Sequence, residues 1–262
     1  MEPTNMAQVK ANGLNFQLAH WEGNGENVLG IHGLTANCRC FDCIAEALYP
    51  EHNLIAPDLR GRGFSDKPAE GYSLSHHCED MEQIISELGL SPVVLMGHSL
   101  GAAISLKLAS QNPALVKGII LIDGGGALSK EQHNHVLEGL RPTVERVGRV
   151  FPDFEEYVNP LKNAPTLQPW NEYLEKYFWY ETELTREGVR SKIKPENIQE
   201  ELANLAETNI QKTYAKISSP VLILRATLGM LKEDDLLLPE DVARNMTEMI
   251  PSARVEDVPE TN

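Results

Sequence analysis

The fold is decided by the stretch Val93-Val94-Leu95-Met96-Gly97-His98-Ser99-Leu100-Gly101. It starts as a short apolar strand and continues into the pattern G-x-S-x-G, and the residues that follow, 102–111, form an Ala-rich helical pattern. In such a strand-turn-helix context, a sharp turn lifts the serine hydroxyl above the edge of the sheet. Glycine is needed on both sides because a Cβ there would strike the neighbouring strand or helix. The pattern therefore predicts that Ser99 is a nucleophile.

The rest of the chain alternates short apolar runs with helical patterns. This alternation is typical of a largely parallel sheet covered by helices on both faces. From about residue 128 to 217 helical, aromatic-rich sequence takes its place, which predicts a core of residues 1–127 and 218–262 and a helical cap of residues 128–217. The predicted core strands are 28–31, 53–56, 93–96, 118–122, 221–224 and 253–258, and the predicted core helices are 75–88 and 102–111.

Aromatic side chains gather within the predicted cap. Six of the chain's sixteen aromatic residues lie in residues 170–180, and positions 170, 173, 177 and 180 share one helix face. That face is expected to pack the cap against the core. A compatible interpretation is that some of these rings, with Trp170 and Tyr173 as candidates, line an apolar substrate pocket.

A second loop is predicted to face Ser99. His32, Gly33 and Leu34 directly follow an apolar strand, and Gly33 lets the backbone approach the serine. The backbone N–H groups of Leu34 and Leu100 are the candidate donors to a developing oxyanion. We expect His32, Gly33 and His98 to border the substrate pocket. His32 is interpreted as an orienting residue and His98 as a packing residue, because neither is placed to act as a general base.

Three motifs together resemble the α/β-hydrolase superfamily: H-G-L-T at 32–35, A-P-D-L-R-G-R-G-F-S-D-K-P at 56–68 and G-H-S-L-G at 97–101. The resemblance spans almost the whole chain. It implies an α/β-hydrolase fold with a mostly parallel sheet, helices on both faces and a helical cap inserted after the sixth strand. Asp58 and Arg60 are interpreted as hydrogen-bonding residues that order their own loop.

The resemblance also implies a triad in the chain order Ser, acid, His. Similar enzymes carry the acid four residues before a proline, which selects Asp235, with Asp234 as its neighbour. Some relatives place the acid at the end of the sixth strand, which makes Asp123 a further candidate.

The triad histidine is expected where the sequence stops. The last predicted strand is followed by Pro259-Glu260-Thr261-Asn262, and all eight histidines lie at or before His135. His133 and His135 belong to the start of the predicted cap. We expect the native protein to continue past Asn262 with the catalytic histidine and a closing helix.

The favoured activity is hydrolysis of a small or medium carboxylic ester through an acyl-enzyme, as in a carboxylesterase of class EC 3.1.1. A serine nucleophile argues against haloalkane dehalogenase and epoxide hydrolase chemistry, which attack through a carboxylate. A lactonase, a C-C bond hydrolase and a cofactor-free haloperoxidase-like enzyme are alternatives on the same residues. A ligand-binding homologue that lacks the triad histidine is another. No cofactor or metal is implied.

Composition limits the partners further. A net charge of −15 and the lack of a Lys/Arg-rich run argue against nucleic acid and anionic membranes as partners. With no targeting or membrane-spanning pattern, we expect a cytoplasmic protein whose oligomeric state stays open. Three of the four cysteines lie in residues 38–43, without a second Cys or His pair to complete a zinc site. They are expected to be reduced thiols.

Overall fold

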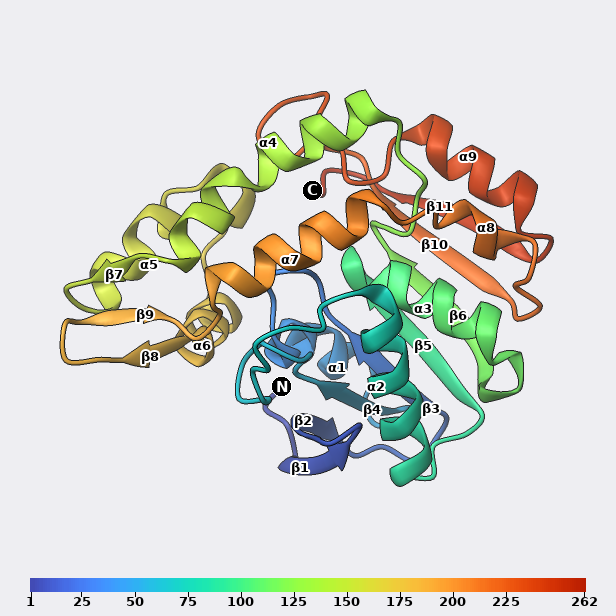
Figure 1. Cartoon of the computed structure of the whole chain (residues 1–262), viewed down its shortest axis with the longest axis horizontal. Helices are drawn as coiled ribbons and strands as arrows, with labels where there is room; N and C mark the ends of the chain where they lie inside the picture. The colour runs from blue at the N-terminus through green and yellow to red at the C-terminus, as the bar shows by residue number, and fades with distance from the viewer.

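The computed structural model describes residues 1–262 apart from the side chain of Pro165. Its main element is an eight-stranded sheet with the order β1-β2-β4-β3-β5-β6-β10-β11 (Figure 1). Strand β2 pairs antiparallel with β1 and β4, and the remaining neighbours are parallel. The strands are β1 (Asn5–Ala11), β2 (Leu14–Trp21), β3 (Asn27–Ile31), β4 (Asn53–Pro57), β5 (Val93–His98), β6 (Val116–Ile122), β10 (Val221–Ala226) and β11 (Ala253–Val258). The mostly parallel sheet predicted from the sequence is confirmed.

The antiparallel hairpin β1–β2 was not predicted. Its strands are joined through Asn12 and Gly13, which both have positive φ, at 48° and 75°. Asn-Gly is a strong hairpin signal because both residues adopt such backbone angles readily. The sequence therefore carried the information for this edge of the sheet.

Helices cover the two faces of the sheet because alternate strand residues point to opposite sides. Leu29 and Leu95 belong to one buried cluster, whereas Val28 and Met96 belong to another. The first cluster includes residues of α2, α3 and α9, and the second includes Ala45 of α1. The bounds are α1 (Asp42–Leu48), α2 (Leu74–Glu87), α3 (Leu100–Gln111) and α9 (Glu240–Met249), with short 3-10 helices at Cys38–Phe41 and Pro113–Leu115.

The segment between β6 and β10 extends away from the sheet (Figure 1). We call residues 128–217 the insertion. It was predicted to be helical, but it also holds a three-stranded antiparallel sheet with the order β7-β9-β8. These strands have two or three residues each, too few to give a periodic sequence signal. The insertion comprises α4 (Lys130–Val147), β7 (Val150–Phe151), α5 (Phe154–Lys162), a 3-10 helix (Pro165–Leu167), α6 (Glu172–Glu181), β8 (Thr182–Leu184), β9 (Val189–Ser191), α7 (Pro195–Ala206) and α8 (Gln211–Tyr214).

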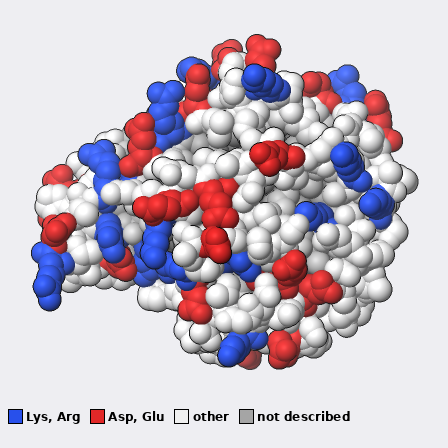
Figure 2. All heavy atoms as spheres, viewed as in Figure 1, with Lys and Arg blue, Asp and Glu red and all other residues white. Residues whose placement is uncertain are grey.

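Charged side chains of both signs are interspersed over the face seen in Figure 2. Among the described helices, none combines the length and apolar character that crossing a bilayer requires.

Candidate active site

Ser99 occupies a strained turn between β5 and α3. Its φ of 51° and ψ of −111° lie in a region that non-glycine residues rarely adopt. The Ser99 N–H donates to the carbonyl of Ile122 at 3.0 Å, which ties the turn to the neighbouring strand β6. The serine therefore stands at the carboxyl end of the sheet and at the amino end of α3, whose dipole favours negative charge there.

The two motif glycines leave no space for a side chain. A Cβ on Gly101 would lie 1.9 Å from the carbonyl oxygen of Ile31, and one on Gly97 would lie 2.2 Å from the carbonyl oxygen of Gly101. Both contacts are with backbone atoms, which cannot move aside. The motif thus lets α3 start directly against β3.

The loop after β3 brings the first candidate oxyanion donor to Ser99. Leu34 and Leu100 both line the cavity that contains Ser99. Among the described residues, neither of their N–H groups has a hydrogen-bond acceptor. Gly33 permits the approach, because a Cβ there would lie 3.5 Å from Ser99 Cβ and 3.1 Å from His98 Nδ1. Two backbone donors are thus free at the cavity.

His32 holds this loop in place. It is fully buried, and its Nδ1 donates to the carbonyl of Gly33 at 2.8 Å while its Nε2 accepts from the N–H of Leu59 at 3.0 Å. Burial lowers the pKa of His32 to about 4, so the ring is neutral at physiological pH. Burial also lowers the pKa of His98. His32, Gly33 and His98 lie behind the cavity wall and are not among its lining residues.

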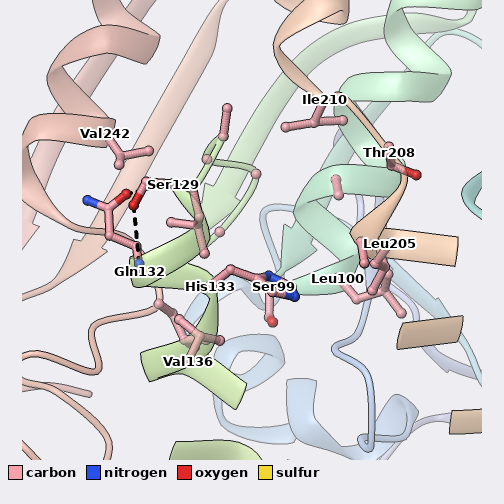
Figure 3. A pocket seen from close by; sticks show the side chains of 18 of the residues that line it. Ser99, Leu100, Ser129, Gln132, His133, Val136, Leu205, Thr208, Ile210 and Val242 are labelled. Atoms are coloured by element: carbon pink, nitrogen blue, oxygen red, sulfur yellow. Dashed lines mark hydrogen bonds between the residues drawn. The ribbon is translucent and has the colours of Figure 1, made fainter. Parts of the chain in front are cut away.

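The cavity beside Ser99 has a volume of about 1150 Å³ and is bounded by the core, α4, α7 and α9. Figure 3 shows the side chains of Val136, Leu205, Ile210 and Val242 around the serine. The two aromatic residues predicted for this pocket lie elsewhere. Trp170 stacks on Phe178 at 5.6 Å within the insertion, and Tyr173 donates to Glu46 on the surface.

Asp123 lies next to Ser99 at the end of the adjacent strand. His98 and Ile122 are register partners on β5 and β6, so Ser99 and Asp123 are the next residue on each strand. Asp123 has a positive φ of 44°, is 7% exposed and lines the same cavity. One of its carboxylate oxygens accepts from the N–H of Ala226 at 3.2 Å, and it has no other donor among the described residues. Burial raises its pKa to about 6.

Asp235 lies in a different environment. Its two carboxylate oxygens accept from the N–H groups of Leu231 at 2.9 Å and Lys232 at 3.1 Å, so it orders its own loop. It borders a second cavity of about 260 Å³ that does not include Ser99. Asp234 borders the same cavity, 3.7 Å from Nδ1 of His135. The structure thus brings Asp123 to the serine and leaves Asp234 and Asp235 apart from it.

One of the eight histidines lines the Ser99 cavity. This histidine is His133 on α4, and Figure 3 shows its side chain near Ser99 in the cavity. Among the described residues, no hydrogen bond joins His133 to Ser99 or Asp123.

The family model described as alpha/beta hydrolase fold matches residues 26–262. Together with the sheet order and the serine turn, this match shows that the chain belongs to the α/β-hydrolase family.

Relatives differ in what their names describe. The chain is 28% identical to 3-hydroxybutyrate-oligomer hydrolase of Cupriavidus necator, with 94% of this chain and 87% of that protein covered. It is 33% identical to 2-(acetamidomethylene)succinate hydrolase of Mesorhizobium japonicum over 51% of this chain and 47% of that protein. It spans only 30% of an uncharacterized protein of Mycobacterium tuberculosis, to which it is 38% identical over 104 residues.

A solved structure shares the fold over nearly the whole chain. The crystal structure of E-2-(acetamidomethylene)succinate hydrolase superimposes with a TM-score of 0.84 at 23% identity, covering 98% of this chain and 91% of that one. At this identity the likeness shows the fold alone.

In the chain of residues 1–262, the raised pKa of Asp123 predicts a stabilising effect of Asp123→Asn. The folded-state pKa of about 6 lies above the ordinary 3.8, so stability is lost as pH rises through the folded pKa. At pH 7.5 the ionised buried carboxylate costs about 1–3 kcal/mol. Because Asn tolerates positive φ, the variant should melt several degrees higher than the wild type, at about 2–4 °C per kcal/mol.

At pH 4 this gain should nearly vanish, because Asp123 is then largely protonated in the folded state. Thermal melts of both proteins at the two pH values check this. An equal difference in melting temperature at both pH values would rule out the protonation explanation.

Proposed function

We propose that the protein is a serine hydrolase that cleaves carboxylic esters with an apolar acyl group through an acyl-enzyme. The observation that carries this proposal is the strained Ser99 turn, which shares one cavity with Asp123 and with the unpaired N–H groups of Leu34 and Leu100. A nucleophile, an acid and two oxyanion donors are four of the parts that acyl transfer uses, and a general base is the fifth.

The reaction begins when Ser99 Oγ attacks the ester carbonyl and a histidine takes its proton. The carbonyl oxygen becomes an anion and accepts from the N–H groups of Leu34 and Leu100, each worth about 3 kcal/mol in the transition state. The same histidine then gives its proton to the leaving alcohol, and water releases the acid from Ser99 in a second cycle. The histidine expected beyond Asn262 stays a prediction.

We assign the role of the acid to Asp123 rather than Asp235. Asp123 follows the strand beside the nucleophile and lacks a second donor among the described residues, so it can orient an imidazole. Asp235 accepts from two N–H groups of its own loop and lines another cavity. Geometry therefore supports the acid at the end of the sixth strand.

Two carboxamide variants decide between the acids. We expect Asp123→Asn to lower kcat by about four orders of magnitude, because an amide cannot hold the histidine in the required tautomer. Asp235→Asn should stay within tenfold of the wild type. The measurement is hydrolysis of a p-nitrophenyl ester by protein expressed from its complete gene, with Ser99→Ala as the inactive reference. The opposite ranking would return the acid to Asp235.

Labelling with a fluorophosphonate tests the nucleophile and its base together. The probe should modify the wild type and not Ser99→Ala. We expect His133→Gln to retain labelling, because His133 belongs to the insertion and has no hydrogen bond to Asp123. Loss of labelling in folded His133→Gln would instead identify His133 as the base.

The cavity wall supports an uncharged, apolar acyl group. Leucine and valine side chains of α4, α7 and α9 line the cavity beside Ser99, together with Ile210. The charged lining residues other than Asp123 are Lys130, Glu207 and Asp241, which are all exposed at the rim. The cavity thus offers no buried cation to neutralise a carboxylate. This favours a neutral ester over a succinate-type substrate, such as the one in the name of the Mesorhizobium relative.

A series of p-nitrophenyl esters tests this preference. Each added methylene that enters the apolar wall should raise kcat/KM about threefold from acetate to hexanoate. The succinate half-ester should react at least tenfold more slowly than the butyrate ester of similar size. In Leu205→Trp, which narrows the cavity, the gain with chain length should be lost while acetate is still cleaved. A faster reaction of the succinate half-ester would contradict the apolar-acyl proposal.

A further inference from the structure

A buried ion cluster joins the insertion to the core beside the active site. Glu201 of α7 is 1% exposed and contacts the guanidinium of Arg62 and Nε2 of His77, the latter at 2.6 Å. Arg62 and His77 are completely buried. The neighbouring Arg60 forms an ion pair with Asp80. Arg62 forms its ion pair with Glu201, so α7 supplies the carboxylate that balances this buried arginine of the core. The neighbouring Leu202 and Leu205 line the Ser99 cavity.

Arg62 also binds the loop of residues 32–35 that follows β3 and carries Leu34, which we call the oxyanion loop. Arg62 Nε donates to the carbonyl oxygen of Leu34 at 2.9 Å, and Arg62 Nη1 donates to the carbonyl of Arg60 at 3.0 Å. One planar guanidinium therefore binds both Leu34, whose N–H is the proposed oxyanion donor, and α7, which contributes Leu202 and Leu205 to the cavity wall. Because the donors of a guanidinium are fixed relative to one another, the two partners cannot move independently.

We propose that Arg62 and Glu201 are positioning residues that align the Leu34 N–H for the oxyanion and keep α7 seated over the cavity. This inference rests on the proposed serine hydrolase function. The Leu34 carbonyl and the Leu34 N–H flank the same Cα, so the hydrogen bond from Arg62 fixes one of the two peptide units that set the direction of this N–H. Arg62 thus acts on the reaction through the Leu34 backbone and does not touch the substrate.

A second anchor of the insertion provides a matched control. Tyr180 of α6 donates to Asp58 at 2.7 Å, and Asp58 also accepts from the N–H groups of Cys38 at 2.8 Å and Phe64 at 2.9 Å. Neither Tyr180 nor Asp58 has a hydrogen bond to Leu34 among the described residues. Tyr180→Phe therefore removes two contacts between the insertion and the core, the hydrogen bonds of the Tyr180 hydroxyl with Asp58 and Cys38 Sγ, and neither involves Leu34.

The decisive variant is Arg62→Lys, which keeps the buried charge beside Glu201 but cannot bridge to the Leu34 carbonyl. We expect kcat for a p-nitrophenyl ester to fall at least tenfold in Arg62→Lys and less than threefold in Tyr180→Phe. The rate for the matching thionoester should fall much less, because its sulfur accepts hydrogen bonds poorly and uses the oxyanion donors less. The ratio of the ester rate to the thionoester rate therefore reports on the oxyanion donors, because a general loss of structure would lower both rates alike.

Active sites are counted by fluorophosphonate labelling carried to completion, so that kcat refers to folded protein. Glu201→Gln, which retains a hydrogen-bond acceptor, should show a smaller change in the same direction. An unchanged ester-to-thionoester ratio in Arg62→Lys would overturn the inference, as would equal effects in Arg62→Lys and Tyr180→Phe. A wild type that the probe does not label at Ser99 would instead overturn the proposed function itself.

Discussion

The contact between Gly101 and the carbonyl of Ile31 is the constraint on which the site depends. A Cβ at position 101 would lie 1.9 Å from that oxygen, so only glycine lets α3 begin against β3. This close start forces the chain through the positive φ of Ser99 and places the first N–H of α3 beside the loop that follows β3. The strained serine and the two free donors are thus consequences of one packing requirement. Strain of this kind persists only where the surroundings determine it fully.

The carboxyl group of Asp123, beside Ser99, lies in an environment that disfavours its ionised form. Asp123 is held nearly buried with a positive φ and a pKa raised to about 6, although Asn would suit that backbone angle and lose less solvation energy than an ionised carboxylate. A carboxylate in this place becomes favourable only when it faces a cation such as an imidazolium. This environment fits the proposed role of Asp123, which is to orient and stabilise an imidazolium. Asp235, whose carboxylate is satisfied by its own loop, carries no such signal.

The sequence predicted the elements that repeat a pattern or carry a motif. Six core strands, two core helices and the Ser99 turn follow from apolar runs and glycine spacing, and the structure contains all of them. The strands β7, β8 and β9 were missed because they are too short for any period. The acid that we propose could not be chosen from spacing to a proline, because the proposal depends on the strand register that puts Asp123 beside Ser99.

Contacts distant in sequence also explain why the pocket aromatics were misplaced and Arg62 was overlooked. Packing of the insertion against the core was predicted for one helix face that included both residues. Tyr173 and Tyr180 do contact the core, through Glu46 and Asp58, whereas Trp170 precedes α6 and packs on Phe178 within the insertion. Arg62 is separated from Glu201 by 139 positions, and only the folded chain brings them together. The wall of the cavity comes mainly from the insertion, whereas the proposed nucleophile, acid and oxyanion donors come from the core. A buried ion pair that spans both parts therefore links the shape of the substrate pocket to the alignment of the chemistry.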